Sequence, residues 1–320
     1  MNAIGGYFEL ELMHGEEYHK NAIKLNTGRN AFEYVLRVKG YQKIYLPYFT
    51  CDAMLEPIQK LNLDYQFYSI DEQFRPIFDF SKIEKNSAFV YTNYFGLCDK
   101  IVKEVNEKCK NLIIDNSQAF YSQPISRVDT FYSPRKFFGV PDGAYLYTDI
   151  LLDYKLETDL SFHRFHHLLG RMDKSAEEFF DSYKNNEEAL SNQAIRQMSK
   201  ITQKILSGID YHTIAERRIK NFNLLNSQLK NRNQLKLNLE LGVVPMVYPF
   251  LINEGLELKK ILIENCVFTA TYWPNILDWC NDDQLEFAMT KEIVYLPVDQ
   301  RYGEFEMKKI IETISNKKTN

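Results

Sequence analysis

Lys136 is the residue of this sequence with the greatest potential for nucleophilic chemistry. It follows Pro134 and Arg135 and precedes two phenylalanines and the loop of residues 139–143. A lysine in a tight turn beside apolar side chains is partly desolvated. Desolvation and the nearby Arg135 charge both lower its pKa and favour the neutral, nucleophilic amine. The plainer interpretation is a solvated surface lysine, because lysine side chains are almost always exposed.

A carboxylate at the end of an apolar run is the second feature. Residues 112–114 are Leu, Ile and Ile, Asp115 follows directly, and Gln118 comes three residues later. A carboxylate at a strand end can pair with a pyridinium nitrogen and keep it protonated, which makes the ring an electron sink. The alternative is an aspartate that caps the next turn.

The third feature is the Thr-Gly-Arg-Asn-Ala segment of residues 27–31, which opens a helical pattern. Free N–H groups at a helix start, together with the helix dipole, favour an anion such as a phosphate. Gly28 lets the backbone come close to a ligand, and Arg29 adds a positive charge. An ordinary helix cap remains the alternative, since threonine and asparagine are common at any helix start.

The elements that must position these residues alternate between helix and strand. The predicted helices span residues 31–38, 51–61 and 100–108, and the predicted strands span residues 43–46, 64–70, 88–92, 112–114 and 144–147. Such alternation predicts an α/β fold, with a mostly parallel sheet flanked by helices. Ligands bind such sheets at the carboxyl ends of the strands, where the three features are expected to lie.

The rest of the chain has a different character. Residues 175–230 are polar and predict long helices, the last over about residues 211–229. Beyond about residue 235, strands near residues 243–251 and 293–296 and helices at 257–263 and 304–314 predict an α+β unit. A chain of 320 residues is long enough for two domains. We expect a large domain over residues 1–207 and a smaller C-terminal domain over residues 208–320, which includes the long linking helix.

Composition argues against several classes of protein. Hydrophobic residues make up 45% and charged residues 26%, and the net charge of −4 offers no basic excess for nucleic acid. No basic amphipathic face and no run of membrane-spanning length is present, so we expect a cytoplasmic protein without a membrane partner. The five cysteines form no C-x-x-C pair and are expected to be reduced thiols.

In order and spacing, these features resemble the DegT/DnrJ/StrS family of sugar aminotransferases. That family depends on pyridoxal 5′-phosphate (PLP) and has PLP fold type I, a large α/β domain with a smaller C-terminal α+β domain. The resemblance covers nearly the whole chain. The matching segments are residues 27–31, 44–50, 113–119, 130–143, 207–229 with Arg217 and Arg218, and 297–302.

The resemblance implies a role for each member of the central trio. Lys136 would carry PLP as a Schiff base and later move the proton between cofactor and substrate carbons. Asp115 would pair with the pyridine nitrogen. Gln118 would lie beside the ring, near its phenolic oxygen.

The remaining cofactor contacts are implied in the same way. Gly28, Arg29 and Asn30 would offer main-chain N–H groups to the phosphate, and Ser133 would offer a hydroxyl. Phe49 would stack on the ring, with the tyrosine before it as the alternative.

The implied reaction moves an amino group, with glutamate as the expected donor, to a keto group of a nucleotide-linked sugar for cell-surface polysaccharide or related biosynthesis. A homodimer is implied as well. One alternative is a sugar dehydratase of the same fold type, in which a histidine replaces the lysine, and Lys136 argues against it. The other is a non-catalytic regulatory protein that keeps the fold, which predicts erosion of the trio, and the trio is intact.

Some residues depart from the family pattern. Ile114 stands where an acidic residue is usual, Arg135 and Arg29 stand where threonine is common, and residues 137–143 replace a Gly-rich stretch. These departures bear on substrate choice.

Three histidines, at positions 163, 166 and 167, are spaced so that their imidazoles could meet on a helix face. No carboxylate or cysteine nearby completes a ligand set, so we predict no metal site there. The rim of the active site or a subunit contact is the preferred interpretation.

Overall fold

The computed structural model describes residues 4–316, which form two sheets and the helices around them. The strands are β1 (Ile23–Leu25), β2 (Lys43–Pro47), β3 (Asp64–Ile70), β4 (Pro76–Ile77), β5 (Ser87–Thr92), β6 (Leu112–Asn116), β7 (Asp129–Tyr132), β8 (Ala144–Tyr147), β9 (Val247–Leu251) and β10 (Ile293–Pro297). The α-helices are α1 (Gly28–Lys39), α2 (Leu55–Lys60), α3 (Asp99–Lys108), α4 (His166–Asp173), α5 (Phe180–Ala189), α6 (Lys200–Ser207), α7 (Tyr211–Leu229), α8 (Gly255–Glu264), α9 (Ile276–Trp279), α10 (Leu285–Glu292) and α11 (Glu304–Ser315). Short 3₁₀ turns are η1 (Asp52–Met54), η2 (Phe80–Lys82), η3 (Tyr94–Gly96), η4 (Pro134–Lys136) and η5 (Phe162–Arg164).

The large sheet has eight strands in the order β1-β8-β7-β6-β5-β2-β3-β4. Its centre, from β7 to β3, is parallel, and β8, β1 and β4 join it antiparallel. The predicted fold class, a mostly parallel sheet flanked by helices, is confirmed. The short strands β1, β4 and β7 were not predicted, because two to four residues give little periodicity.

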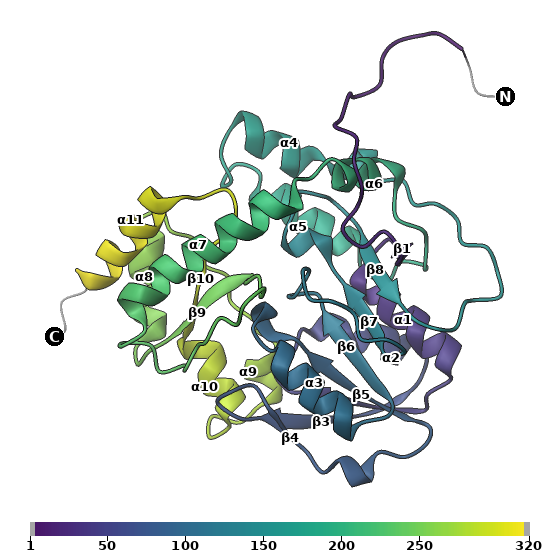
Figure 1. Cartoon of the computed structure of the whole chain (residues 1–320), viewed down its shortest axis with the longest axis horizontal. Helices are drawn as coiled ribbons and strands as arrows, with labels where there is room; N and C mark the ends of the chain where they lie inside the picture. The colour runs from purple at the N-terminus through teal and green to yellow at the C-terminus, as the bar shows by residue number, and fades with distance from the viewer. Residues whose placement is uncertain (1–3, 317–320) are drawn as a thin grey trace.

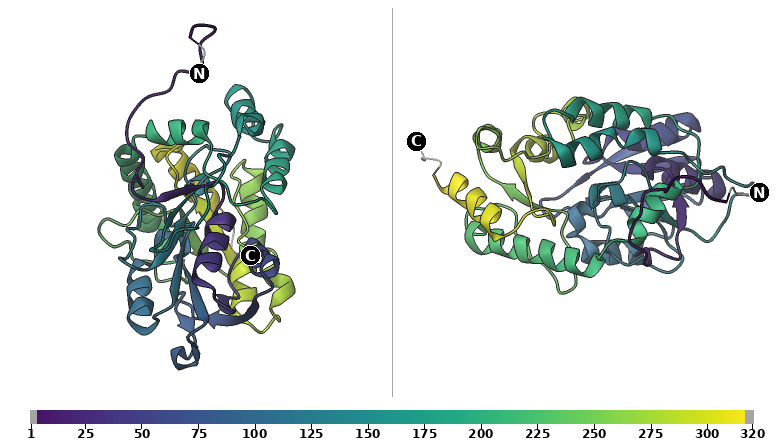
Figure 2. Two further views of the ribbon diagram at one scale, coloured as in Figure 1. Left: turned by 90° about the vertical axis from the view of Figure 1, so that its right-hand side faces the viewer. Right: turned by 90° about the horizontal axis from the view of Figure 1, so that it is seen from above.

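Helices cover both faces of this sheet (Figures 1 and 2). Alternate residues of one strand therefore enter different cores: Ile44 and Leu46 pack with α1, whereas Tyr45 packs on the face that α3 covers. Burial on both faces explains why these strands are nearly continuous apolar runs rather than alternating ones.

The smaller sheet pairs β9 with β10 antiparallel. Its apolar side chains share a separate core with α7, α8 and α11. Figure 1 shows this group beside the large sheet, with the 19-residue α7 running from one to the other. The boundary proposed at residues 207 and 208 stays a prediction.

The prediction of long helices over residues 175–230 is only partly right. Residues 190–199 leave the helical path between α5 and α6 and lie against β1, where the N–H of Met198 donates to the carbonyl of Lys24 at 3.1 Å. The segment thereby satisfies part of the open edge of the sheet. Its polar sequence has no hydrophobic periodicity that would predict this pairing with the edge of the sheet.

Among residues 4–316, no helix is both long and apolar enough to cross a membrane. All five cysteines are free thiols, as expected.

Candidate active site

The three chemical features converge because of strand direction. β6 and β7 are parallel neighbours, with Asp115 opposite Phe131 in register. β1 is antiparallel to β8, which is antiparallel to β7, so β1 and β7 run the same way. The carboxyl ends of β1, β6 and β7 therefore share one edge of the sheet. The start of α1 and the turn that holds Lys136 follow the ends of β1 and β7, and Asp115 lies in the last two residues of β6.

Lys136 ends the 3₁₀ turn η4 directly after β7. Its side chain is exposed to solvent, but the surrounding protein desolvates the amine and lowers its pKa. The charges of Arg135 and Arg29 lower the pKa further, while Cys51 and Asp115 act in the opposite direction. An amine that is accessible yet desolvated is suited to nucleophilic attack. The lowered pKa predicted from the sequence is confirmed in direction and in cause.

Ser133 precedes Lys136 at the start of the same turn and is 8% exposed. Its hydroxyl makes no cap hydrogen bond to the turn, although its main-chain carbonyl accepts from the N–H of Lys136 at 3.3 Å. The side chain is therefore not needed to hold the local structure.

Asp115 is 6% exposed, and burial raises its pKa. Ser117 opposes this shift through its main-chain N–H, at 2.8 Å from Oδ1, and through its hydroxyl. The positive charge of Lys136 also lowers the pKa of Asp115, so the two side chains act on one another. The hydroxyl of Thr92 also lowers the pKa of Asp115 through a hydrogen bond, so donors as well as a nearby cation favour the charged carboxylate.

Gln118 is buried at 3% exposure beside Asp115. Its side-chain carbonyl accepts a hydrogen bond from the N–H of Phe95 at 3.0 Å. Because the carbonyl oxygen is thereby oriented, the amide NH₂ group is the part of Gln118 that can donate to a ligand.

Thr27 caps helix α1. Its hydroxyl oxygen accepts from the N–H of Asn30 at 3.1 Å, and its carbonyl accepts from the N–H of Ala31 at 3.0 Å. Of the three main-chain donors expected to bind a phosphate, Asn30 is thus already used. In the described part of the chain, the N–H groups of Gly28 and Arg29 have no such partner and stay open to an anion.

The structure does not present Phe49 to a ligand. This side chain is 0% exposed and packs against Phe74, Tyr94 and Trp273 at ring-centroid distances of 6.3, 5.6 and 5.4 Å. The alternative, Tyr48, stacks on Phe67 at 4.8 Å. A role in ring stacking would require either side chain to leave these contacts.

Cys51 was missed by the sequence reasoning. It follows β2 at the same edge of the sheet, and among the titratable neighbours it has the largest effect on the pKa of Lys136. Burial raises the pKa of the Cys51 thiol itself. Its position directly after residues 44–50 was the available signal.

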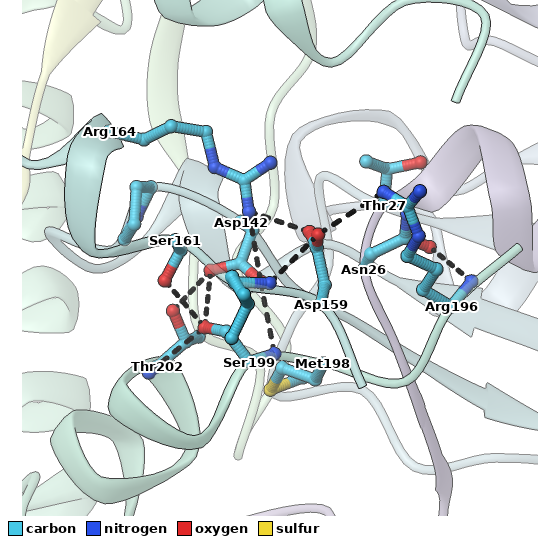
Figure 3. Close-up of polar contacts among 12 residues, drawn as sticks. Asn26, Thr27, Asp142, Asp159, Ser161, Arg164, Arg196, Met198, Ser199 and Thr202 are labelled. Carbon is cyan, nitrogen blue, oxygen red and sulfur yellow. Dashed lines mark hydrogen bonds and ion pairs between the residues drawn. The ribbon is translucent and has the colours of Figure 1, made fainter. Parts of the chain in front are cut away.

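A buried polar network fixes the loop that returns from Lys136 to β8 (Figure 3). Asp142 is 0% exposed and accepts from the N–H and the hydroxyl of Ser199 at 3.2 and 3.0 Å, and from the hydroxyl of Thr202. Next to it, the N–H of Gly143 donates to the carbonyl of Asn26 at 2.6 Å. The lysine loop and the start of α1 are thereby tied to one framework.

The same loop is held from the C-terminal side. The carbonyl of Phe137 accepts from Gln300 Nε2 at 2.7 Å and from Arg218 Nη2 at 3.4 Å. Arg218 is 1% exposed, and its guanidinium lies 4.5 Å from the centre of the Phe137 ring. Arg217, the other member of the arginine pair, is exposed.

The histidines do not gather into a ligand set. His163 and His166 are exposed, His167 is buried, and Nδ1 of His166 lies 3.0 Å from the hydroxyl of Ser182. In the part of the chain that the structure describes, no group of three His, Cys, Asp or Glu side chains is placed to hold a metal ion.

No family model and no curated protein matches the sequence. Solved structures do match the fold. The sugar aminotransferase CalS13 from Micromonospora echinospora aligns with a TM-score of 0.62 at 12% identity, over 92% of this chain and 87% of that chain. A DegT DnrJ EryC1 StrS aminotransferase from Brucella abortus aligns with a TM-score of 0.61 at 14% identity, over 92% and 85%. The PLP form of Spr1654 from Streptococcus pneumoniae aligns with a TM-score of 0.63 at 14% identity, over 91% and 85%. The chain therefore has the fold of these sugar aminotransferases.

Proposed function

We propose that this protein is a PLP-dependent sugar aminotransferase in which Lys136 carries the cofactor. The observation that supports this most is the electrostatic coupling of Lys136 with Asp115 at one edge of the sheet, beside the open start of α1. An amine, a buried carboxylate and an anion site in one place are the three groups that PLP needs. The likeness in fold to sugar aminotransferases supports the same proposal.

The residues present fit the cofactor. Buried Asp115 suits a protonated ring nitrogen, because a buried carboxylate is stable only beside a cation or donors. The amide of Gln118 suits the phenolic oxygen. The open N–H groups of Gly28 and Arg29 suit the phosphate, with the Ser133 hydroxyl close in sequence to Lys136.

When bound, PLP supplies an electron-withdrawing ring that stabilises negative charge at the carbon that loses a proton. The chain's own residues do the rest. Asp115 keeps the ring nitrogen protonated. Lys136 would accept a proton at Nζ from one reacting carbon and return it to the other. The lowered pKa of Lys136 favours this exchange, because more of its amine is neutral at a given pH.

The finer assignment is also part of the proposal. We expect glutamate as the amino donor and a keto group on a nucleotide-linked sugar as the acceptor, in cell-surface polysaccharide or related biosynthesis. We also expect a homodimer located in the cytoplasm. These expectations rest on the resemblance in sequence described above.

Replacing Lys136 tests the proposal directly. Wild-type protein mixed with PLP should gain an absorbance band near the visible edge that shifts when glutamate is added, as the amino group moves to the cofactor. Lys136→Ala should lose the band and turnover, because the amine proposed to bond the cofactor is removed. Lys110→Ala, which removes an exposed lysine after α3, is the matched control and should behave as wild type. If Lys136→Ala transaminated at the wild-type rate, this lysine would be misassigned.

A further inference from the structure

Buried polar atoms without a hydrogen-bond partner concentrate around Arg135, next to Lys136. Nine such atoms are found in residues 4–316, and six of them belong to side chains around Arg135. They are Nε of Arg29, Arg135 and Arg164, Nδ1 of His167, Oδ1 of Asn186 and Oε1 of Glu187, the last of which forms an ion pair with Arg135. Each unsatisfied buried group costs about 1–3 kcal/mol, so such a group of them calls for an explanation, and a missing ligand is one.

The side chains of this group are close enough to act on one another electrostatically. Burial lowers the pKa of Arg135 to about 10, and the positive charges of Arg29 and Arg164 contribute to the same shift. Arg135 in turn helps to lower the pKa of His167. Keeping positive groups together in a desolvated site is unfavourable unless anions compensate them.

The neighbouring carboxylates compensate the arginines only in part. Arg164 is well paired, since its Nη2 lies 2.6 Å from Asp159 and 3.8 Å from Asp142. Arg135 contacts Glu187 through Nη2 alone. Arg29 lies 3.4 Å from Glu56 without a well-formed hydrogen bond at Nε.

A guanidinium has five N–H donors, so Arg29 and Arg135 both keep donors to spare. Arg29 donates through Nη1 to the carbonyl of Leu190 at 3.4 Å, which is a weak contact. The open N–H groups of Gly28 and Arg29 add to these donors at the start of α1. A doubly charged, tetrahedral anion would match this set, because arginines bind phosphate oxygens through paired N–H donors.

We propose that Arg135 and Arg29 together bind the phosphate group of PLP, which makes Arg135 a cofactor-binding residue in addition to those predicted from the sequence. This inference rests on the proposed function. It assigns a purpose to two departures from the family pattern, since arginine stands in both places where threonine is common. The two guanidiniums supply the charge that hydroxyl groups lack.

Comparing PLP with pyridoxal tests the assignment, because pyridoxal has the same aldehyde but no phosphate. The measurement is the equilibrium affinity of the cofactor-free protein for each aldehyde, read from the Lys136-dependent absorbance band. Arg135→Met should weaken PLP binding about 10- to 100-fold, the loss expected for a charge-assisted hydrogen bond, and change pyridoxal binding by less than about twofold. Arg135→Lys should lie between the two.

Glu187→Gln is the matched control. It removes the partner of Arg135 but keeps the guanidinium, so PLP should bind at least as tightly as to wild type. Inorganic phosphate gives an independent readout: it should raise the melting temperature of cofactor-free wild type, and Arg135→Met should abolish that rise.

Several outcomes would overturn the inference: equal losses for PLP and pyridoxal, unchanged PLP affinity, or a loss in Glu187→Gln as large as in Arg135→Met. A raised KM for glutamate with unchanged PLP affinity would assign Arg135 to the donor's carboxylate and overturn it too. The proposed function fails separately, if wild type forms no Lys136-dependent band with either aldehyde. Even then, protection by inorganic phosphate still reports on the arginine pair.

Discussion

Burial acts on Lys136 and Asp115 in opposite directions. It lowers the pKa of the lysine and raises that of the aspartate, so each side chain is shifted toward its neutral form. For Lys136 the neutral form is the nucleophile. For Asp115 the shift is a cost that a cationic ring nitrogen would relieve, because an opposite charge nearby favours the carboxylate. The same desolvated edge of the sheet thus prepares both groups for one ligand.

A further buried titratable residue, His19, contributes to how stability depends on pH. Its Nε2–H donates to the carbonyl of Phe120 at 2.7 Å, and Nδ1 accepts from the hydroxyl of Tyr147 at 3.2 Å. Burial lowers the pKa of His19 to about 4. The ordinary value, about 6.5, applies to the unfolded chain. Protons therefore bind the unfolded state more readily, and stability falls as the pH drops from about 6.5 to about 4.

We expect this loss to reach about 3 kcal/mol at pH 4. The measurement is the free energy of unfolding in urea from pH 7 to pH 4. His19→Gln should show a shallower decline than wild type, because glutamine does not titrate. His163→Gln, at an exposed position, should reproduce the wild-type slope. Identical slopes for His19→Gln and wild type would contradict the role of this residue.

At the residue scale, spacing along the chain was enough to predict that Asp115 and Lys136 share one edge of the sheet. Asp115 is near the end of β6 and Lys136 comes just after its parallel neighbour β7, so the sheet brings them together whatever the details of packing. Their roles toward a cofactor stay predictions. The complete burial of Phe49 was not predictable from spacing along the chain. Its burial depends on Phe74, Tyr94 and Trp273, which come from distant parts of the chain. The sequence also did not show that the main-chain N–H of Asn30 is used within the protein, because this depends on how the Thr27 hydroxyl caps helix α1.

At the scale of elements, the loop between η4 and β8 is shaped by Gly143. This residue has a backbone φ of +117°, which residues other than glycine rarely adopt. A Cβ there would lie 3.2 Å from Pro134 and 3.3 Å from both Met198 and Thr202. Pro134 is in the lysine turn, so a displaced neighbour would move Lys136 as well.

Gly143→Ala should therefore lower the free energy of unfolding by about 2–4 kcal/mol, from backbone strain and overpacking together. Gly40→Ala is the matched control, because Gly40 also has a positive φ, +65°, but nothing lies within 4 Å of its added Cβ. It should cost about 1–2 kcal/mol. Urea denaturation followed by circular dichroism compares the two variants. Equal losses would show that crowding at Gly143 contributes nothing.

The longer elements were predictable because their burial imposes a pattern. Strands β5 and β6 contain buried apolar runs, and α1 carries both a polar start and a periodic face. The conformation of residues 190–199 was not predictable from the sequence. This segment is held by hydrogen bonds to Asn26 and β1, and its own composition does not indicate them. Long-range hydrogen bonds leave no local periodicity in a sequence.

At the scale of the molecule, exposed apolar side chains collect near α4 and α5. Phe162 is 72% exposed, Met172 82% and Phe180 52%. Figure 1 places α4 and α5 by the large sheet, far from α11. Grouped exposed apolar residues of this kind are typical of surfaces that a partner covers. We therefore expect the predicted homodimer to use this surface, named here the α4–α5 surface.

Light scattering on the purified protein tests that expectation. Wild type should have twice the chain mass of 37.8 kDa. The double variant Phe162→Asp, Met172→Asp should shift the protein to the single-chain mass, because burying two unpaired carboxylates in an apolar contact is costly. Phe305→Asp, on α11 and 77% exposed in the wild type, is the matched control and should remain a dimer. A single-chain mass for wild type would rule out the dimer. A dimer that survives the double variant would place its interface away from the α4–α5 surface, and a dimer lost with Phe305→Asp would place it near α11.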